Sequence, residues 1–215
     1  MTPADVLVWT AQVLYLGRFL VQWLASERAG RSVAPRVFWW LSLIAVLLLG
    51  AGVGLDGLWI LLPACCVNAA IYAHNLLRRE GSGSRLGPLA AAGLGGLAAV
   101  ALLATQLDST SDAWAGLPPA ILVSALVGQA IWSVRFPLQW LLSERAGRTH
   151  FPLAFWWLSL AGAGCNLAYT GWLGEPKYIV GYVLAWLVPL RNLALEYRRR
   201  ASAPRSAEEP TRRSP

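Results

Sequence analysis

Two arginines, Arg18 and Arg135, lie inside long apolar segments, where inserting a charged side chain costs about 2.5–3.5 kcal/mol. At 100° per residue along a helix, two glutamines share a face with each arginine. Gln12 and Gln22 lie with Arg18, and Gln129 and Gln139 lie with Arg135. A guanidinium keeps its charge and matches the geometry of a phosphate. The pattern therefore predicts an intramembrane site for an anionic group, with amides that bind nearby hydroxyls.

Further polar and aromatic residues extend this candidate binding site. Asn75 and Asn192 lie near the inner ends of their apolar segments, and Trp23 and Trp140 follow the inner glutamines. Simpler roles compete with substrate binding. The arginines have long stems that can reach the cytoplasmic interface, the amides can bond between helices, and tryptophans commonly anchor a chain at the membrane surface.

The composition indicates an integral membrane protein. Of the 215 residues, 56% are hydrophobic and 13% are charged, whereas ordinary globular domains carry roughly 25% charged residues. The formal net charge of +7 does not indicate a nucleic-acid partner, because arginines beside a membrane meet anionic lipids. No Lys or Arg precedes the first apolar run, which argues for a retained span and against a cleaved signal peptide.

Seven segments are long and apolar enough to cross a bilayer, which takes about 20 residues. They cover 4–25, 37–53, 57–77, 86–107, 117–142, 153–173 and 178–195. Of the 18 Lys and Arg, 14 fall in alternate connections or the C-terminal tail, and the opposite connections hold only Lys177. Since positive connections face the cytoplasm, we expect the N-terminus outside and the C-terminus inside.

The chain contains an internal repeat with an offset of 117 residues. Between 18–43 and 135–160, 18 of 26 positions are identical. We predict an all-α fold of seven transmembrane helices, arranged as a 3+1+3 parallel tandem repeat with the site between the copies. The expected units are a first copy over 1–80, a linker helix and outer loop over 81–116, a second copy over 117–198, and a disordered basic tail over 199–215.

The reactive residues do not form a recognisable catalytic set. No Asp or Glu lies at the centre of a span, where a proton relay would need one. The two histidines and three cysteines lack metal-ligand spacing, and no nucleophile–base set or phosphate-binding glycine loop is apparent. We therefore expect no enzymatic activity, no metal and no cofactor, and transport that runs down a gradient or by exchange.

The repeated motif resembles the lipid A biosynthesis N-terminal domain family, within the broader PQ-loop and SWEET-like superfamily. The residues that carry the resemblance are Gln22-Trp23, Ser26-Glu27, Pro35 and Phe38-Trp39, their equivalents Gln139-Trp140, Ser143-Glu144, Pro152 and Phe155-Trp156, and then Gly162, Tyr169 and Arg191-Asn192-Leu193. The resemblance implies a bacterial inner-membrane protein that acts near lipid-linked sugars. Such domains extend some lipid-A-disaccharide synthases, but no part of this chain resembles the soluble body of that enzyme.

Three functional hypotheses follow. The first is a flippase-like carrier of a polyprenyl-phosphate sugar or another anionic, lipid A-related glycolipid, held by Arg18 and Arg135. The second is a non-catalytic membrane subunit that docks a glycosyltransferase on its basic inner side. The third is a SWEET-type facilitator of small solutes, which ranks last because a free sugar has no charge to compensate a buried arginine.

Overall fold

The computed structural model of the protein describes residues 1–29, 35–77, 87–104, 114–145 and 152–201. The connections over 30–34 and 146–151 and the predicted tail from 202 onward lie outside this part. The described residues form helices and no strands. The elements are α1 (Pro3–Ala29), α2 (Arg36–Leu55), a 3₁₀ turn η1 (Trp59–Leu61), α3 (Leu62–Leu77), α4 (Gly87–Ala104), α6 (Pro119–Arg145), α7 (Leu153–Leu173) and α8 (Pro176–Ala201).

Prolines and a capping box set the helix starts. Pro3, Pro119 and Pro176 are the first residues of α1, α6 and α8, a position where the missing proline N–H costs no helical bond. At the start of α1, the Thr2 N–H donates to Asp5 Oδ2 at 2.7 Å, and the Asp5 N–H donates to Thr2 Oγ1 at 3.1 Å. These reciprocal bonds satisfy donors that a helix N-terminus leaves open.

The middle helices of the two copies end alike. Beyond the end of α2, Gly57 has a φ of +69°, and Gly174, 117 residues later, has the same φ after α7. This left-handed conformation suits glycine. Both α2 and α7 also begin directly after a proline, Pro35 and Pro152. The repeat seen in the sequence therefore extends to the backbone at both ends of these helices.

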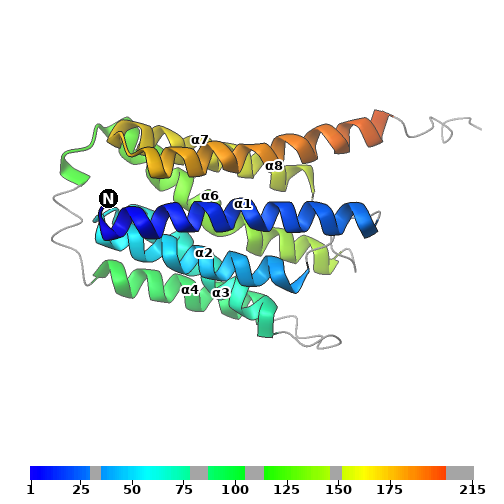
Figure 1. Ribbon diagram of the computed structural model, residues 1–215. Coiled ribbons are helices and arrows are strands. Elements are labelled where there is room, and N and C mark those ends of the chain that lie inside the picture. The colour runs from blue at the N-terminus through cyan, green and yellow to red at the C-terminus, as the bar shows by residue number, and fades with distance from the viewer. Residues whose placement is uncertain (30–34, 78–86, 105–113, 146–151, 202–215) are drawn as a thin grey trace, which may run out of the picture.

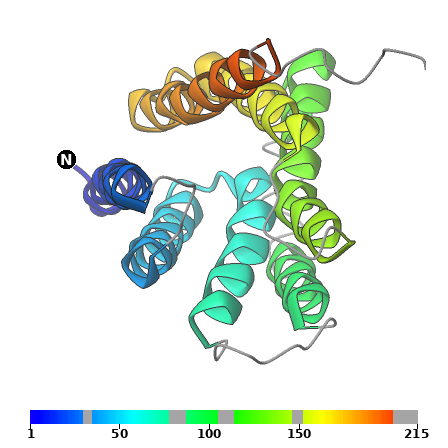
Figure 2. The same ribbon diagram turned by 90° about the vertical axis from the view of Figure 1, so that its right-hand side faces the viewer.

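The helices form a bundle in which two sets of three meet (Figures 1 and 2). In the first copy, α2 packs against both α1 and α3; in the second, α7 packs against both α6 and α8. The copies touch where α3 meets α6 and where α1 meets α8. These two contacts exchange with each other when α1, α2 and α3 are matched to α6, α7 and α8.

The linker helix α4 packs mainly against α3, beside the first copy. Gly95 is buried in this contact. A Cβ built at Gly95 would lie 2.7 Å from the carbonyl oxygen of Cys66 and from Cα of Val67. Any larger residue would therefore push the two backbones apart.

Five helical segments are apolar and long enough to cross a membrane: Pro3–Ala25, Arg36–Leu55, Trp59–Leu77, Pro119–Gln139 and Pro176–Arg198. α4 and α7 are not among these five within the described residues. α7 has the length, but its Trp, Asn, Tyr and Thr residues lower its hydropathy. The all-α, membrane-compatible character is thus confirmed, and the count of seven spans stays a prediction.

Helix boundaries differ from the predicted spans mainly at the C-terminal ends of α1 and α8. α1 continues to Ala29 and α8 to Ala201, beyond the predicted limits of 25 and 195. Residues 199–201, expected in a disordered tail, are helical. The segment before them, Leu193–Arg198, consists mostly of good helix formers. Hydropathy marks where a span leaves the bilayer, whereas helix propensity carries the helix further.

Candidate functional site

Arg18 is buried in the middle of α1, with 7% of its surface exposed. Its Nη1 donates to Ser42 Oγ of α2 at 3.1 Å and to Tyr72 Oη of α3 at 3.2 Å. The Ser42 hydroxyl donates in turn to the Phe38 carbonyl at 2.6 Å, so a lone pair of Ser42 is free to accept from Arg18. All three helices of the first copy therefore hold this guanidinium.

Aromatic rings surround the same guanidinium. The Cζ of Arg18 lies 4.5 Å from the ring centre of Tyr15, 4.8 Å from that of Phe19, 5.5 Å from that of Phe38 and 5.9 Å from that of Tyr72. Aromatic faces attract cations, and more strongly where water is excluded. The rings stabilise the positive charge of Arg18 without neutralising it.

Arg135 of α6 is buried to the same extent, at 7% exposed. Its Nη1 donates to Ser159 Oγ of α7 at 3.5 Å, the repeat equivalent of the bond from Arg18 to Ser42. Its Cζ lies 3.7 Å from the ring centre of Trp132 and 4.7 Å from that of Phe136. Arg135 therefore keeps one of the two hydroxyl contacts that Arg18 makes and stacks on a tryptophan.

Neither buried arginine has a carboxylate partner among the described residues, where the ion pairs involve Lys177 and Arg191. The Nε atoms of Arg18 and Arg135 also lack a hydrogen-bond partner there. A buried charge without a counter-ion is costly. Two of them at repeat-equivalent positions point to an anionic ligand that would pair with them.

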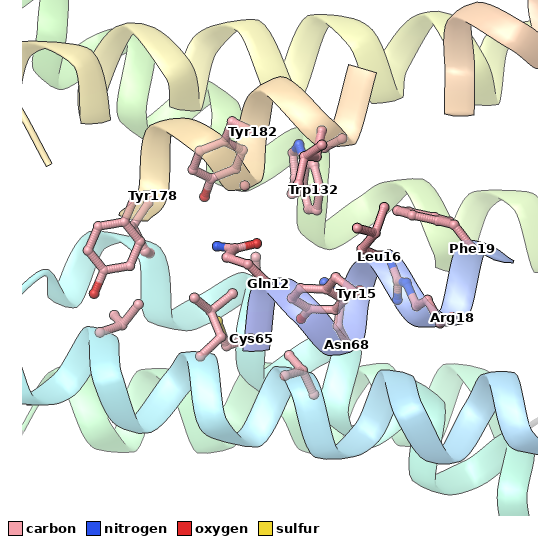
Figure 3. A pocket seen from close by; sticks show the side chains of 18 of the residues that line it. Gln12, Tyr15, Leu16, Arg18, Phe19, Cys65, Asn68, Trp132, Tyr178 and Tyr182 are labelled. Carbon is pink, nitrogen blue, oxygen red and sulfur yellow. The ribbon is translucent and has the colours of Figure 1, made fainter. Parts of the chain in front are cut away.

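A central cavity of about 70 Å³ lies between the copies. Its walls come from α1, α2, η1 and α3 on one side and from α6 and α8 on the other (Figure 3). The lining residues with polar side-chain atoms are Gln12, Tyr15, Arg18, Asn68, Tyr72, Trp132, Tyr178 and Tyr182. This volume holds several water molecules but is well below the roughly 300–1,000 Å³ of small-molecule sites.

Unsatisfied polar atoms concentrate around this cavity. Arg18 Nε, Asn68 Oδ1 and Trp132 Nε1 are buried, lack a partner among the described residues and belong to side chains that line it. Asn68 and Arg18 are 5% and 7% exposed. Buried polar groups nearly always have a partner, so the cavity offers donors and an acceptor for a ligand that carries both charge and hydroxyl groups.

The structure brings only some of the predicted site residues to the cavity. Arg18 and Gln12 line it, and Gln12 Nε2 donates across the copies to the Lys177 carbonyl at 3.1 Å. Gln129 instead donates to Asn166 Oδ1 at 2.7 Å within its own copy. Arg135 adjoins the cavity through Trp132, which lines it.

The remaining predicted residues lie elsewhere. Gln22, Gln139, Asn75 and Asn192 are half-buried and are not among the lining residues. Asn192 Nδ2 donates to the Val188 carbonyl of its own helix at 2.8 Å. Trp23 is 45% exposed and donates to Glu27 at 3.1 Å, as an interfacial tryptophan would. The side chain of Trp140 lies outside the described residues.

Sequence reasoning missed three cavity residues that carried a usable signal. Asn68 and Tyr72 lie seven and three residues before Asn75, on the same helical face. They are therefore about two turns and one turn away from Asn75 along the helix. Tyr15 shares the face of Gln12 and Arg18. The tyrosines of α8 carried no such signal.

An ion cluster at the end of the bundle where α1 and α8 begin was also not predicted. Lys177 is 5% exposed, and its Nζ lies 2.7 Å from Asp5, 2.8 Å from Asp56 and 3.6 Å from Glu175. Tyr178 Oη donates to the same Asp56 carboxylate at 2.8 Å. This Lys177 cluster joins the start of α1, the turn after α2 and the start of α8. It adjoins the cavity through Tyr178, which lines it.

The described residues contain no group of three or more His, Cys, Asp or Glu placed to hold a metal ion. The polar groups at the cavity offer charge and hydrogen bonds. They can hold an anionic, hydroxylated group between the copies, with Arg18 as the charged contact and Asn68 and Gln12 as amide contacts.

The chain is similar to lipid-A-disaccharide synthases of several Chlamydia species. It is 29% identical over 204 residues to a lipid-A-disaccharide synthase of Chlamydia pneumoniae, covering 90% of this chain and 33% of that protein. The identity to the synthases of Chlamydia felis and Chlamydia trachomatis serovar D is 27% and 25%, covering 88% and 92% of this chain and 32% and 36% of theirs. The chain thus spans about a third of the length of these curated relatives.

No solved structure matches the chain. The model of the Lipid A Biosynthesis N-terminal domain matches twice, over residues 8–77 and 125–194. The two matches begin 117 residues apart, the offset of the internal repeat. Each match contains one buried arginine with its hydroxyl partner on the next helix. The chain therefore belongs to the Lipid A Biosynthesis N-terminal domain family.

Proposed function

We propose that the protein is a membrane carrier for an anionic glycolipid, such as a polyprenyl-phosphate sugar or a lipid A-related intermediate. The observation that carries this proposal is the pair of buried arginines, each without a carboxylate partner among the described residues and one of them lining the central cavity. A phosphate would pair with such a charge and accept the free Nε–H. The family and its synthase relatives support a glycolipid over other anions.

The proposed carrier has seven spans in a 3+1+3 parallel repeat related to PQ-loop and SWEET-like proteins. Its copies cover 1–80 and 117–198, with 81–116 as the linker. It lies in the bacterial inner membrane with its N-terminus outside. The charge asymmetry of the connections and the double family match support this arrangement. Membrane lipids are then its surroundings, and a nucleic acid is not a partner.

Within this carrier, Arg18 and then Arg135 bind the phosphate, and Gln12 and Asn68 bind hydroxyls. Gln22, Gln139, Asn75, Asn192, Gln129 and the tryptophans Trp23 and Trp140 are proposed as contacts on the path toward the inner side. The cavity is too small for a glycolipid head group. The copies must therefore move apart for the substrate to enter, with the repeat contacts as the places that change.

A reconstituted flip assay tests this proposal. The protein is placed in vesicles of phosphatidylethanolamine and phosphatidylglycerol with a fluorescent polyprenyl-phosphate hexose, and a membrane-impermeant quencher reports the outer-leaflet fraction. Arg18→Ala and Arg135→Ala should each slow flipping at least about tenfold, since a bond to a charged group contributes about 1.5–3 kcal/mol. Arg198→Ala is the matched control, because Arg198 is exposed near the end of α8 and does not line the cavity. Wild-type rates in both buried variants would refute the carrier.

A second candidate function is that of a membrane subunit for a lipid A glycosyltransferase. The synthase relatives favour it, because their matching region is one part of a longer protein. The docking surface would be the basic inner end, where Arg28 and Arg145 are exposed in the last turns of α1 and α6. A soluble glycosyltransferase that co-purifies with wild type and with Arg18→Ala, but not with Arg28→Ala/Arg145→Ala, would favour this role over transport.

A further inference from the structure

The two copies meet along two seams that differ in chemistry. The first, where α3 meets α6, is apolar. The ring centres of Tyr72 and Phe136 lie 6.0 Å apart in an edge-to-face contact. Further out, Ile60, Leu61 and Ala125 belong to one buried apolar cluster. Opening this α3–α6 seam would expose packed apolar surface of both copies at once.

The second seam, where α1 meets α8, is held by polar bonds. At its outer end the buried Lys177 pairs with Asp5 at 2.7 Å, and Gln12 donates to the Lys177 carbonyl at 3.1 Å. At its inner end Arg191 pairs with Glu27 at 3.3 Å, with both side chains exposed. Exposed ion pairs of this kind contribute about 0–1 kcal/mol. The polar bonds of the α1–α8 seam can exchange partners as it opens, whereas a packed apolar contact cannot.

The central cavity lies directly behind the α1–α8 seam. α1 lines it with Leu16 and Phe19, and α8 lines it with Leu184 and Ala185. Leu16 is also 44% exposed. The same apolar side chain therefore lines the cavity and keeps accessible surface. Figure 3 shows Leu16, Phe19 and Arg18 together on α1 at one end of the pocket.

We infer that the α1–α8 seam is a lateral portal for a lipid: once the copies have moved apart, the anionic head group occupies the enlarged central cavity at Arg18, and its hydrocarbon chain passes between Leu16 and Ala185 into the bilayer. This inference rests on the proposed function and deepens it. An apolar chain cannot share a buried polar cavity without loss of head-group contacts, and it gains nothing by leaving hydrocarbon. A seam with an apolar middle and polar ends lets the head group of the lipid lie in the polar cavity while its hydrocarbon chain stays in the bilayer.

The experiment narrows the portal without changing the cavity charge. Purified protein in detergent is tested for binding of a radiolabelled polyprenyl-phosphate hexose and of hexose 1-phosphate, which has the same head group and no chain. Ala185→Trp should weaken binding of the lipid probe at least about tenfold and change binding of hexose 1-phosphate less than about twofold. The matched control is Val183→Trp, which places the same ring on the exposed face of α8 and should change neither.

A second pair protects the test against misfolding of one variant. Leu16→Trp narrows the portal from α1, and Val13→Trp is its control, since Val13 is 68% exposed and does not line the cavity. Equal loss of both probes in the two portal variants, or no loss of either, would overturn the portal and leave the proposed function standing. Wild-type protein that binds neither probe would overturn the proposed function and the portal with it.

Discussion

The two copies keep the same arginine but support it differently. Arg18 donates to two hydroxyls, at 3.1 and 3.2 Å, whereas Arg135 donates to one hydroxyl at 3.5 Å. The missing second hydroxyl partner has a sequence cause. Tyr72, the second partner of Arg18, corresponds in the repeat to Pro189 inside α8, which has no hydroxyl. The copies thus preserve the charge, while only the first holds it rigidly at the cavity.

The paired glutamines differ in the same sense. Gln12 bonds across the α1–α8 seam to the other copy, whereas Gln129 bonds to Asn166 within its own copy. The repeat equivalent of Asn166 is Leu49, so the first copy has no amide at that position to accept a bond from Gln12. Divergence at partner positions, rather than at the conspicuous polar residues themselves, assigns the copies different roles.

The largest expected effect comes from replacing Lys177 of the second copy by the residue at the equivalent position of the first copy. Lys177 corresponds to Ile60 in the first copy, and Lys177→Ile leaves three carboxylates without their cation. Removing one partner of a fully buried pair costs about 3–5 kcal/mol. Because these carboxylates are partly exposed, we expect a loss on the order of 2–3 kcal/mol, measured by denaturant unfolding in detergent. Arg191→Ile at the exposed pair should cost less than about 1 kcal/mol, and equal losses would contradict the assigned role of Lys177.

Giving the second copy the first copy's residue at Asn166 should have the next largest effect. Asn166→Leu leaves the buried Gln129 amide without its partner, which costs about 1–3 kcal/mol. The same unfolding measurement checks this value. The double variant Gln129→Leu/Asn166→Leu should recover part of the loss, because no buried amide then remains unpaired. Strict additivity of the two single changes would show that the bond contributes nothing.

A smaller effect is expected from making the first arginine resemble the second. Tyr72→Phe removes one hydroxyl partner of Arg18 while keeping the ring against Phe136. We expect the affinity for the polyprenyl-phosphate hexose to fall about tenfold, equivalent to about 1.4 kcal/mol, with unfolding nearly unchanged. Tyr178→Phe, which removes a hydroxyl bonded to Asp56 instead, is the control for a tyrosine of the same cavity. An unchanged affinity in Tyr72→Phe would mean that the hydroxyl does not position Arg18.

The smallest effect separates the two serines. Ser42→Ala removes an acceptor at 3.1 Å from Arg18, and Ser159→Ala removes one at 3.5 Å from Arg135. Since hydrogen bonds weaken with distance, we expect Ser42→Ala to lower the affinity for the same probe about three- to fivefold and Ser159→Ala less than twofold. The reverse order would place the principal charge at Arg135.

The sequence allowed the helices and the arginine-bearing faces to be predicted, because local rules determine them. Apolar length located the helices, and the helical period placed Gln12 beside Arg18. The cavity was harder to predict, since Asn68 and Asn75 share a face of α3 and only the tertiary packing selects Asn68 as a lining residue. The Lys177 cluster could not be predicted, because its four residues lie in three separate parts of the chain and meet only when the copies pack.

The close approach of α4 to α3 at Gly95 has a mechanical consequence. A connecting helix that packs closely on one neighbour moves with that neighbour, so α4 is expected to move with the first copy. α4 thus reverses the chain direction between the copies while it packs mainly on one of them. Any side chain at Gly95 would separate α4 from α3. Gly95 does not line the cavity, so the cavity itself should not change.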